Sequence, residues 1–189
     1  TAVDEHSIIL VKELREKETA DEIDRIAKTI EETLNAETNS RVYISSGTIV
    51  SDLKDVSRSY KEAKMALEVG KIFETDKYIV NYEKLGIGRL IYQLPLPLCR
   101  MFIKEVLHGL TMDDFDDETL ATVNKFFENN LNVSETSRQL YIHRNTLVYR
   151  LDKLQKMTGL DLRNFDDAII FKITLMVSKY MIYMDKMAY

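Results

Sequence analysis

The first 85 residues alternate short apolar runs with longer stretches that have helical periodicity. The run SIILV at residues 7–11 is continuous and too short for a helix, so it predicts a buried strand. Between Thr19 and Asn35 apolar residues return every three or four positions, which predicts a helix that starts with a Thr19–Glu22 capping box. The inner face of this helix would consist of Ile23, Ile26, Ala27, Ile30 and Leu34.

Two more strands and one more helix complete this part of the pattern. RVYIS at residues 41–45 alternates as a half-buried strand does, and KYIVNY at residues 77–82 is a third strand candidate. Between them a helix is expected to begin at Asp52 or Asp55 and to run to about Phe73. Its inner side would hold Tyr60, Ala63, Leu67 and Gly70. The order strand, helix, strand, helix, strand predicts a small α/β layer with helices packed on a sheet.

From residue 86 onward the pattern is helical only. Residues 86–112 form a predicted connector that Pro95 and Pro97 interrupt, because proline lacks an N–H and has a fixed φ. In the acidic run at 113–118, Asp116 and Asp117 are candidate N-caps, and carboxylates suit the positive end of a helix. The expected fold class is therefore α+β, with an α/β layer at 1–85, the connector at 86–112 and an all-helical domain at 113–189.

Three helices are expected between residues 118 and 158. The first covers about 118–130, the second spans 133–140 after an Asn132 cap, and the third runs over about 144–158 until Gly159 ends it. The inward residues would be Leu120, Val123, Phe126 and Phe127 in the first helix and Leu147, Leu151 and Leu154 in the third. Thr136 and Ser137 are small where two helices would cross. A short helix, a three-residue link and a longer helix have the proportions of a helix-turn-helix.

The polar side of the third helix could read DNA or could simply be solvated. Arginine suits guanine, asparagine suits adenine, and hydroxyl groups and lysine suit phosphates. The candidates for base edges are His143, Arg144, Asn145, Tyr149 and Arg150, and the candidates for phosphates are Ser134, Thr146 and Lys153. Tyr141 stands where a generic helix-turn-helix has glycine, which can adopt a positive φ.

Charge and composition limit the possible functions. The net charge of −5 argues against binding nucleic acid by overall charge, but residues 131–163 carry six Lys or Arg against three Asp or Glu. Cys99 is the only cysteine, which excludes an internal disulfide, and three scattered histidines indicate neither a catalytic triad nor a metal site. The most apolar run, AIIFKITLMV, is shorter than a membrane span, and no signal peptide opens the sequence. We therefore expect a soluble, cytoplasmic protein.

The last predicted helix, at residues 166–184, has a wide apolar face. Its members are Ile169, Ile170, Ile173, Met176, Val177 and Tyr180. Packing on the helix-turn-helix and contact with a second copy are both compatible with this face.

Two long stretches of the chain resemble one family of bacterial regulators. The stretch NVSETSRQLYIHRNTLVYRLDKLQKMTGLDLRNFDDAIIFKITLMV looks like the C-terminal helix-turn-helix of the carbohydrate diacid regulator (CdaR) and PucR family. In that family a bulky residue also stands at the turn. Upstream, SSGTIVSDLKDVSRSYKEAKMALEVGKI followed by YIVNYEKLGI resembles the GGDEF-like domain that precedes this module.

The resemblance implies a transcription regulator that binds double-stranded DNA as a homo-oligomer, with 144–158 as recognition helix. It also implies that the α/β part is an N-terminally truncated GGDEF-like sandwich, and that a sensor domain outside this chain binds a small-molecule effector. Ala2 and Val3 replace the two glycines of the GGDEF signature, so Asp4 and Glu5 are expected to be solvated turn residues and no catalytic or cofactor site is expected. The alternative is a nucleotide-binding or enzymatic module with a helical appendage for protein interaction.

Overall fold

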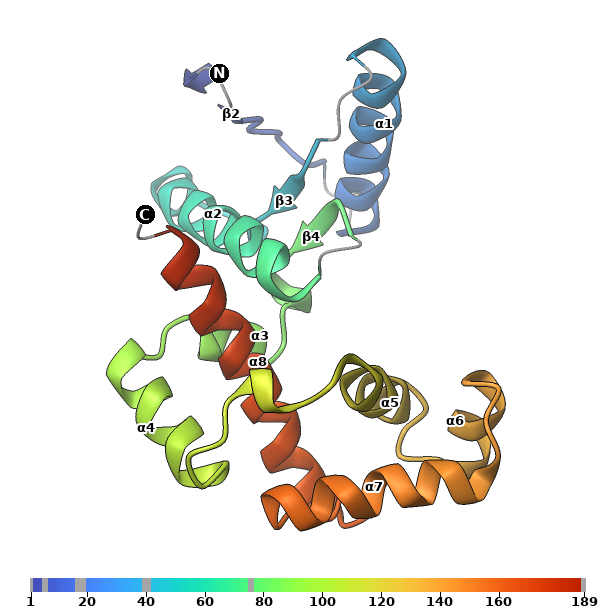
Figure 1. Ribbon diagram of the computed structural model, residues 1–189. Coiled ribbons are helices and arrows are strands. Elements are labelled where there is room, and N and C mark those ends of the chain that lie inside the picture. The colour runs from blue at the N-terminus through green and yellow to red at the C-terminus, as the bar shows by residue number, and fades with distance from the viewer. Residues whose placement is uncertain (1, 5–6, 16–19, 39–41, 75–76, 188–189) are drawn as a thin grey trace. The chain divides into compact units, whose positions relative to one another are not determined.

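The computed structural model describes residues 2–4, 7–15, 20–38, 42–74 and 77–187. It has two compact units, residues 1–89 and 90–189, which are described separately below (Figure 1). The first unit is a small α/β layer and the second is all helical, so the α+β fold class predicted from the pattern is confirmed.

In the first unit a helix connects two parallel strands. Strand β3 (Ile44–Ser46) pairs with β4 (Ile79–Asn81) in a register that sets Ile44 opposite Ile79. Between them lie the 3-10 turn η1 (Leu53–Asp55) and helix α2 (Val56–Phe73), and α1 (Ala20–Thr38) precedes β3. Close packing depends on Gly70, because a Cβ there would come within 2.7 Å of the Val80 side chain. The 3-10 turn η2 (Tyr82–Lys84) follows β4.

The prediction of a buried strand at residues 7–11 is wrong. Strand β2 covers only Ser7–Ile8 and pairs antiparallel with β1 (Ala2–Asp4), and Ile8 is 79% exposed. Leu10 and Val11 are exposed as well, so this apolar run does not contribute a third strand to the β3–β4 sheet. Asp4 lies in β1 rather than in a turn, whereas Glu5 is outside the described residues.

The two helices of this unit form where they were expected, but one residue predicted on the inner face of α2 is exposed. The predicted inner residues of α1 are all at least partly buried; Thr19 of the predicted capping box lies outside the described residues. In α2 the buried residues are Ala66, Val69, Gly70 and Ile72; of the predicted inner residues, Ala63 and Leu67 are partly buried and only Tyr60 is exposed. Glu62, which was not among the predicted inner residues, turns toward Thr48 and accepts hydrogen bonds from both its backbone N–H (3.0 Å) and its hydroxyl.

The helices of the second unit follow the predicted order. After the short helix α3 (Gly88–Ile91), α4 (Leu96–Val106) begins behind the N-cap Pro95, so the helical stretch is interrupted there, whereas Pro97 is accommodated in the first turn of α4. The 3-10 turn η3 (Met112–Asp114) leads into α5 (Asp117–Glu128), α6 (Val133–Gln139), α7 (Arg144–Thr158) and α8 (Phe165–Met187). No described helix is both long and apolar enough to cross a membrane.

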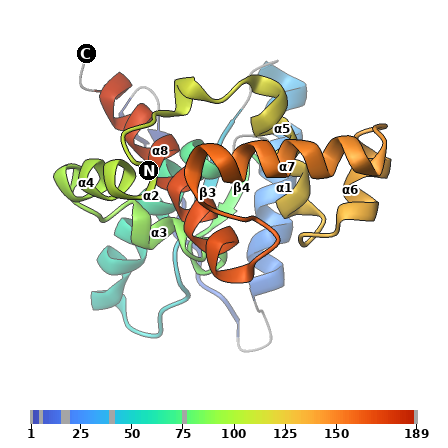
Figure 2. The same ribbon diagram turned by 60° about the horizontal axis from the view of Figure 1, so that its bottom comes forward.

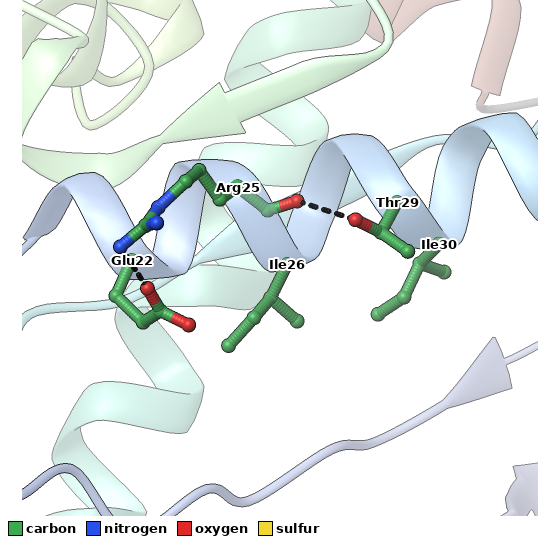
Figure 3. Close-up of a pocket in the computed structure, with 5 residues that line it drawn as sticks. All are labelled: Glu22, Arg25, Ile26, Thr29 and Ile30. Atoms are coloured by element: carbon green, nitrogen blue, oxygen red, sulfur yellow. Dashed lines mark hydrogen bonds and ion pairs between the residues drawn. The ribbon is translucent and has the colours of Figure 1, made fainter.

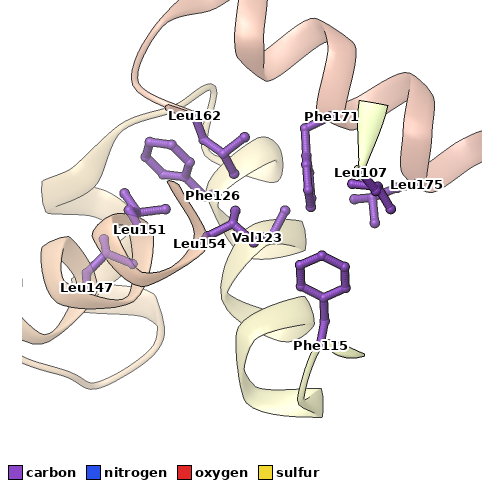
Figure 4. Close-up of a cluster of buried hydrophobic side chains, with 10 residues drawn as sticks. All are labelled: Leu107, Phe115, Val123, Phe126, Leu147, Leu151, Leu154, Leu162, Phe171 and Leu175. Carbon is purple, nitrogen blue, oxygen red and sulfur yellow. The ribbon is translucent and has the colours of Figure 1, made fainter. Parts of the chain in front are cut away.

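A shared core holds α5, α7 and α8 together (Figure 4). It comprises Leu107, Phe115, Val123, Phe126, Leu147, Leu151, Leu154, Leu162, Phe171 and Leu175. Phe115 and Phe171 meet edge to face, with ring centroids 6.0 Å apart. The face predicted for α8 is only partly right, because Ile169 and Ile170 are exposed while Phe171 and Leu175 enter the core.

Candidate nucleic-acid interface

Helices α6 and α7 are placed by side-chain caps and by a buried leucine stripe. Asn132 caps α6 by accepting a hydrogen bond from the Glu135 backbone N–H (3.0 Å). The reciprocal half of the expected capping box is not formed, because the Glu135 carboxylate binds Arg138 and Gln139 instead. The leucines predicted to face inward, Leu147, Leu151 and Leu154, are fully buried (Figure 4). This burial fixes which side of α7 is exposed.

The turn between the two helices has the geometry that ends a helix with a left-handed residue. The Tyr141 N–H donates to the Arg138 carbonyl (3.1 Å) and the Ile142 N–H to the Ser137 carbonyl (3.0 Å). Tyr141 has φ +54°. Helix α7 then begins after His143, whose ring Nδ1 accepts a hydrogen bond from the Asn145 N–H (3.2 Å). Since Nδ1 accepts, Nε2 carries the proton of the neutral ring and can donate outward.

The exposed side of α7 holds most of the side chains predicted to contact DNA. Asn145 and Tyr149 lie one turn apart and are exposed, as are Arg144 and Thr146 in the first turn. Ser134 is exposed at the start of α6. Figure 2 shows α7 along its length, with α6 beside its first turns and α5 on its inner side.

Arg150 is the exception. Its side chain is only 17% exposed; Nη1 donates to the Thr122 hydroxyl (3.0 Å) and Nη2 forms an ion pair with Glu118. Thr122 is itself buried and donates to the Glu118 carbonyl (2.8 Å), so three side chains join α7 to α5. The expectation that both arginines are free to reach a ligand therefore holds for Arg144 and is wrong for Arg150.

Lys153 also has a partner on α5. Its Nζ lies 3.0 Å from the carboxylate of Asp116, which at the same time caps α5 by accepting a hydrogen bond from the Thr119 N–H (2.7 Å). Hydrogen bonding from Thr119, with a smaller contribution from Lys153, lowers the pKa of Asp116 from 3.8 to about 2. The pair is half exposed on both sides, so Lys153 can exchange this carboxylate for another anion at little cost.

Ion pairs neutralise most of the positive charge of residues 131–163, the basic window of the sequence. Arg138 binds Glu135 through two 2.8 Å contacts, and Arg163 binds Asp152 (2.8 Å) and Asp161 (2.7 Å). Within the part of the chain that the structure describes, Arg144 and Lys156 are the cations of this window without an ion-pair partner. The positive charge offered to a ligand is therefore small and concentrated on the exposed side of α7.

The first unit offers no comparable constellation among its described residues. A shallow hollow on α1 is lined by Glu22, Arg25, Ile26, Thr29 and Ile30, all from one face of one helix (Figure 3). Arg25 is paired with Glu22, and the Thr29 hydroxyl donates to the Arg25 carbonyl (3.0 Å). Ligand pockets are concave and gather polar groups from several elements, so this hollow gives no support to nucleotide binding. The described residues also contain no cluster of His, Cys, Asp and Glu that could hold a metal.

These features define the class of the second unit: a helix-turn-helix whose second helix is exposed on one side and packed on α5 on the other. Comparison with known families makes this specific. Residues 119–177 match the PucR C-terminal helix-turn-helix domain, and residues 1–69 match the GGDEF-like domain. The chain therefore belongs to the family of the carbohydrate diacid regulator (CdaR) and PucR, with a GGDEF-like domain followed by a PucR-type helix-turn-helix.

Three relatives illustrate the similarity. The chain is 28% identical over 132 residues to the purine catabolism regulatory protein of Bacillus subtilis, covering 69% of this chain and 25% of the relative. It is 31% identical over 139 residues to the carbohydrate diacid regulator of Escherichia coli, covering 74% and 36%. It is 28% identical over 144 residues to the proline-responsive transcriptional activator PutR of Bacillus subtilis, covering 73% and 34%. The chain thus spans only about a quarter to a third of the length of these relatives.

Proposed function

We propose that this chain binds duplex DNA, with α7 as the recognition helix in the major groove and α6 across the backbone. The observation that carries this proposal is the burial of Leu147, Leu151 and Leu154, which leaves Asn145 and Tyr149 on the open side of α7. In a helix-turn-helix the first residues of the second helix contact base edges. Arg144 stands at that position and is exposed.

The contacts divide by chemistry. Arg144 is suited to the O6 and N7 atoms of guanine, Asn145 to adenine, and the Nε2–H of His143 to an acceptor on a base edge. Ser134 and Thr146 supply hydroxyl groups for phosphates, and Lys153 joins them when it leaves Asp116. Tyr149 lies one turn after Asn145 on the same exposed side of α7 and would face the next bases.

Arg150 takes a different role from the one expected from sequence. Because its guanidinium holds Glu118 and Thr122, we assign it to positioning α7 on α5 rather than to reading a base. A recognition helix must be held at a fixed angle to its domain if its side chains are to meet base edges in register.

At the level of the whole protein we propose a cytoplasmic bacterial transcription regulator that is not an enzyme. Single helix-turn-helix modules usually act in pairs on two half-sites, so we expect a homo-oligomer on DNA. The relatives are named as regulators of purine catabolism, carbohydrate diacids and proline response, and by analogy a small-molecule effector would be bound by a sensor domain outside this chain.

Selection of bound sequences from a random duplex pool, followed by titration of variants, tests this function. Arg144→Ala should weaken binding to the selected duplex by about 1–3 kcal/mol and relax base preference at one position. Lys104→Ala, an exposed cation on α4, is the matched control and should leave binding unchanged. The proposal fails if no sequence is enriched and binding is negligible even at low salt. Calorimetric titration with GTP and cyclic dinucleotides would then test the nucleotide-binding alternative.

A further inference from the structure

Four helices of the second unit end next to a residue in the left-handed conformation. The residues are His108 after α4 (φ +51°), Asn130 after α5 (φ +50°), Tyr141 after α6 (φ +54°) and Gly159 after α7 (φ +78°). Glycine is the usual residue at such a position, and asparagine and histidine are enriched there among the others. A bulky aromatic residue is not, so Tyr141 needs an explanation. The other bulky residue with a positive φ, Leu131 (φ +62°), packs against the core, whereas Tyr141 does not.

The backbone of Tyr141 cannot avoid this conformation. Its N–H and the next one close the end of α6 through hydrogen bonds to Arg138 and Ser137, and the chain must reverse here to start α7. The same pair of bonds closes α5, where Asn130 donates to Phe127 (3.1 Å) and Leu131 to Phe126 (2.9 Å). Glycine would satisfy this geometry without steric conflict between Cβ and the backbone.

The side chain of Tyr141 brings no compensation within the fold. It is 96% exposed, and among the described residues it forms no hydrogen bond, ion pair or ring contact. A tyrosine therefore strains the turn and adds nothing to the core. A contact outside the chain is the remaining reason for an aromatic hydroxyl at this place.

The position of the side chain indicates which contact this is. Tyr141 precedes the N-cap of α7 by two residues and the exposed Arg144 by three. From Leu140 to Tyr149 the sequence contains His143 and the exposed Arg144 but no carboxylate, so this end of the helix suits an anion. Where a recognition helix enters the major groove the adjacent DNA element is the sugar-phosphate backbone, and tyrosine hydroxyls are established phosphate donors.

We propose that the Tyr141 hydroxyl donates a hydrogen bond to a backbone phosphate of duplex DNA at the point where α7 enters the groove. This assignment rests on the DNA-binding function proposed above. It adds a contact that carries no base preference, because phosphates are alike in every sequence.

The test compares Tyr141→Gly and Tyr141→Phe in the 189-residue chain. His108→Gly is the matched control, since it relieves the same backbone conformation at α4, which lies on the opposite side of the unit from α6 (Figures 1 and 2). Thermal melting gives the stability. Fluorescence anisotropy gives the affinity for the selected duplex and for a scrambled one, each of about 30 base pairs so that two half-sites fit. Sedimentation velocity reports the oligomeric state.

A structural role and a DNA-contact role predict opposite results for Tyr141→Gly. We expect its melting temperature to equal or exceed that of the wild type, while its affinity falls roughly tenfold on both duplexes, as for one lost hydrogen bond to a charged group. Tyr141→Phe should lose the same affinity, and His108→Gly should lose none.

Three outcomes overturn the assignment. They are wild-type affinity in Tyr141→Gly, wild-type affinity in Tyr141→Phe, and a change of oligomeric state that accounts for the loss, which would place Tyr141 against a second copy. Arg144→Ala, measured in parallel, keeps the two proposals apart: if it loses affinity and Tyr141→Gly does not, DNA binding stands and only the tyrosine contact falls. If the wild type binds neither duplex, both proposals fail.

Discussion

Removing the Arg150 side chain should destabilise the second unit more than removing an exposed arginine does. Its guanidinium is mostly buried, binds the Thr122 hydroxyl at 3.0 Å and pairs with Glu118. A hydrogen bond from a charged group is worth about 1.5–3 kcal/mol. The Glu118 side chain is largely exposed, so solvent screening limits the Arg150–Glu118 share to about 0.5–1 kcal/mol. We therefore expect Arg150→Ala to cost about 2 kcal/mol of the free energy of unfolding.

A double-mutant cycle of Arg150→Ala with Glu118→Gln isolates the contribution of the Arg150–Glu118 ion pair. Asp117→Asn is the control, because Asp117 is in the same first turn of α5 and forms no ion pair among the described residues. Urea unfolding followed by far-UV circular dichroism gives the free energies, with the two units fitted as separate transitions. The cycle should show a coupling energy of about 0.5–1 kcal/mol for Arg150 with Glu118 and about zero for Arg150 with Asp117.

A cost of less than about 0.5 kcal/mol for Arg150→Ala, as for an ordinary surface substitution, would contradict a role for Arg150 in holding α7 on α5. A second contradictory result would come from DNA binding. If Arg150→Ala leaves stability intact but relaxes preference at a single base, as expected for Arg144→Ala, then Arg150 leaves α5 on binding and reads a base after all.

Three further outcomes follow from the second unit. Thr136 is fully buried and its hydroxyl has no hydrogen-bond partner among the described residues, so Thr136→Val should raise the free energy of unfolding by about 1 kcal/mol in urea titrations. The pKa of Asp116 is lowered to about 2, so its stabilising effect is complete above its ordinary 3.8 and is lost as pH falls toward 2; Asp116→Asn keeps the cap and should flatten that part of an acid titration followed by circular dichroism. With Lys153 and Lys156 as the cations available to phosphates, each subunit should give a log–log salt slope of about −2 in anisotropy titrations, and a slope twice as steep would show that the other ion pairs open on DNA.

Local signals in the sequence predicted the second unit well. The starts of α5, α6 and α7 each lie within one residue of the predicted start, because Asp116, Asn132 and His143 cap them with their own side chains. The leucine stripe of α7 was predicted correctly, since apolar spacing alone determines which side of an isolated helix faces a core.

Two of the errors have a different cause, which is contact between residues far apart in the chain. Arg150 looks like a surface residue until Glu118 and Thr122, about thirty positions earlier, are placed beside it. The inner face predicted for α2 included Tyr60, which is exposed, and missed Glu62, a charged residue that hydrogen-bonds Thr48 fourteen positions earlier. The run at residues 7–11 is apolar enough for a core, yet its described pairing is with Ala2–Asp4, in a two-stranded sheet separate from β3–β4. Periodicity carries no information on such partners.

The most direct test of the account is methylation interference on the selected duplex. Dimethyl sulfate modifies guanine N7, which lies in the major groove and is half of the pattern that arginine recognises. If α7 enters that groove, methylation of particular guanines should abolish binding of the wild-type chain, and Arg144→Ala should lose the interference at one of them. Binding that tolerates methylation of every guanine would contradict the proposal that the exposed side of α7 reads DNA.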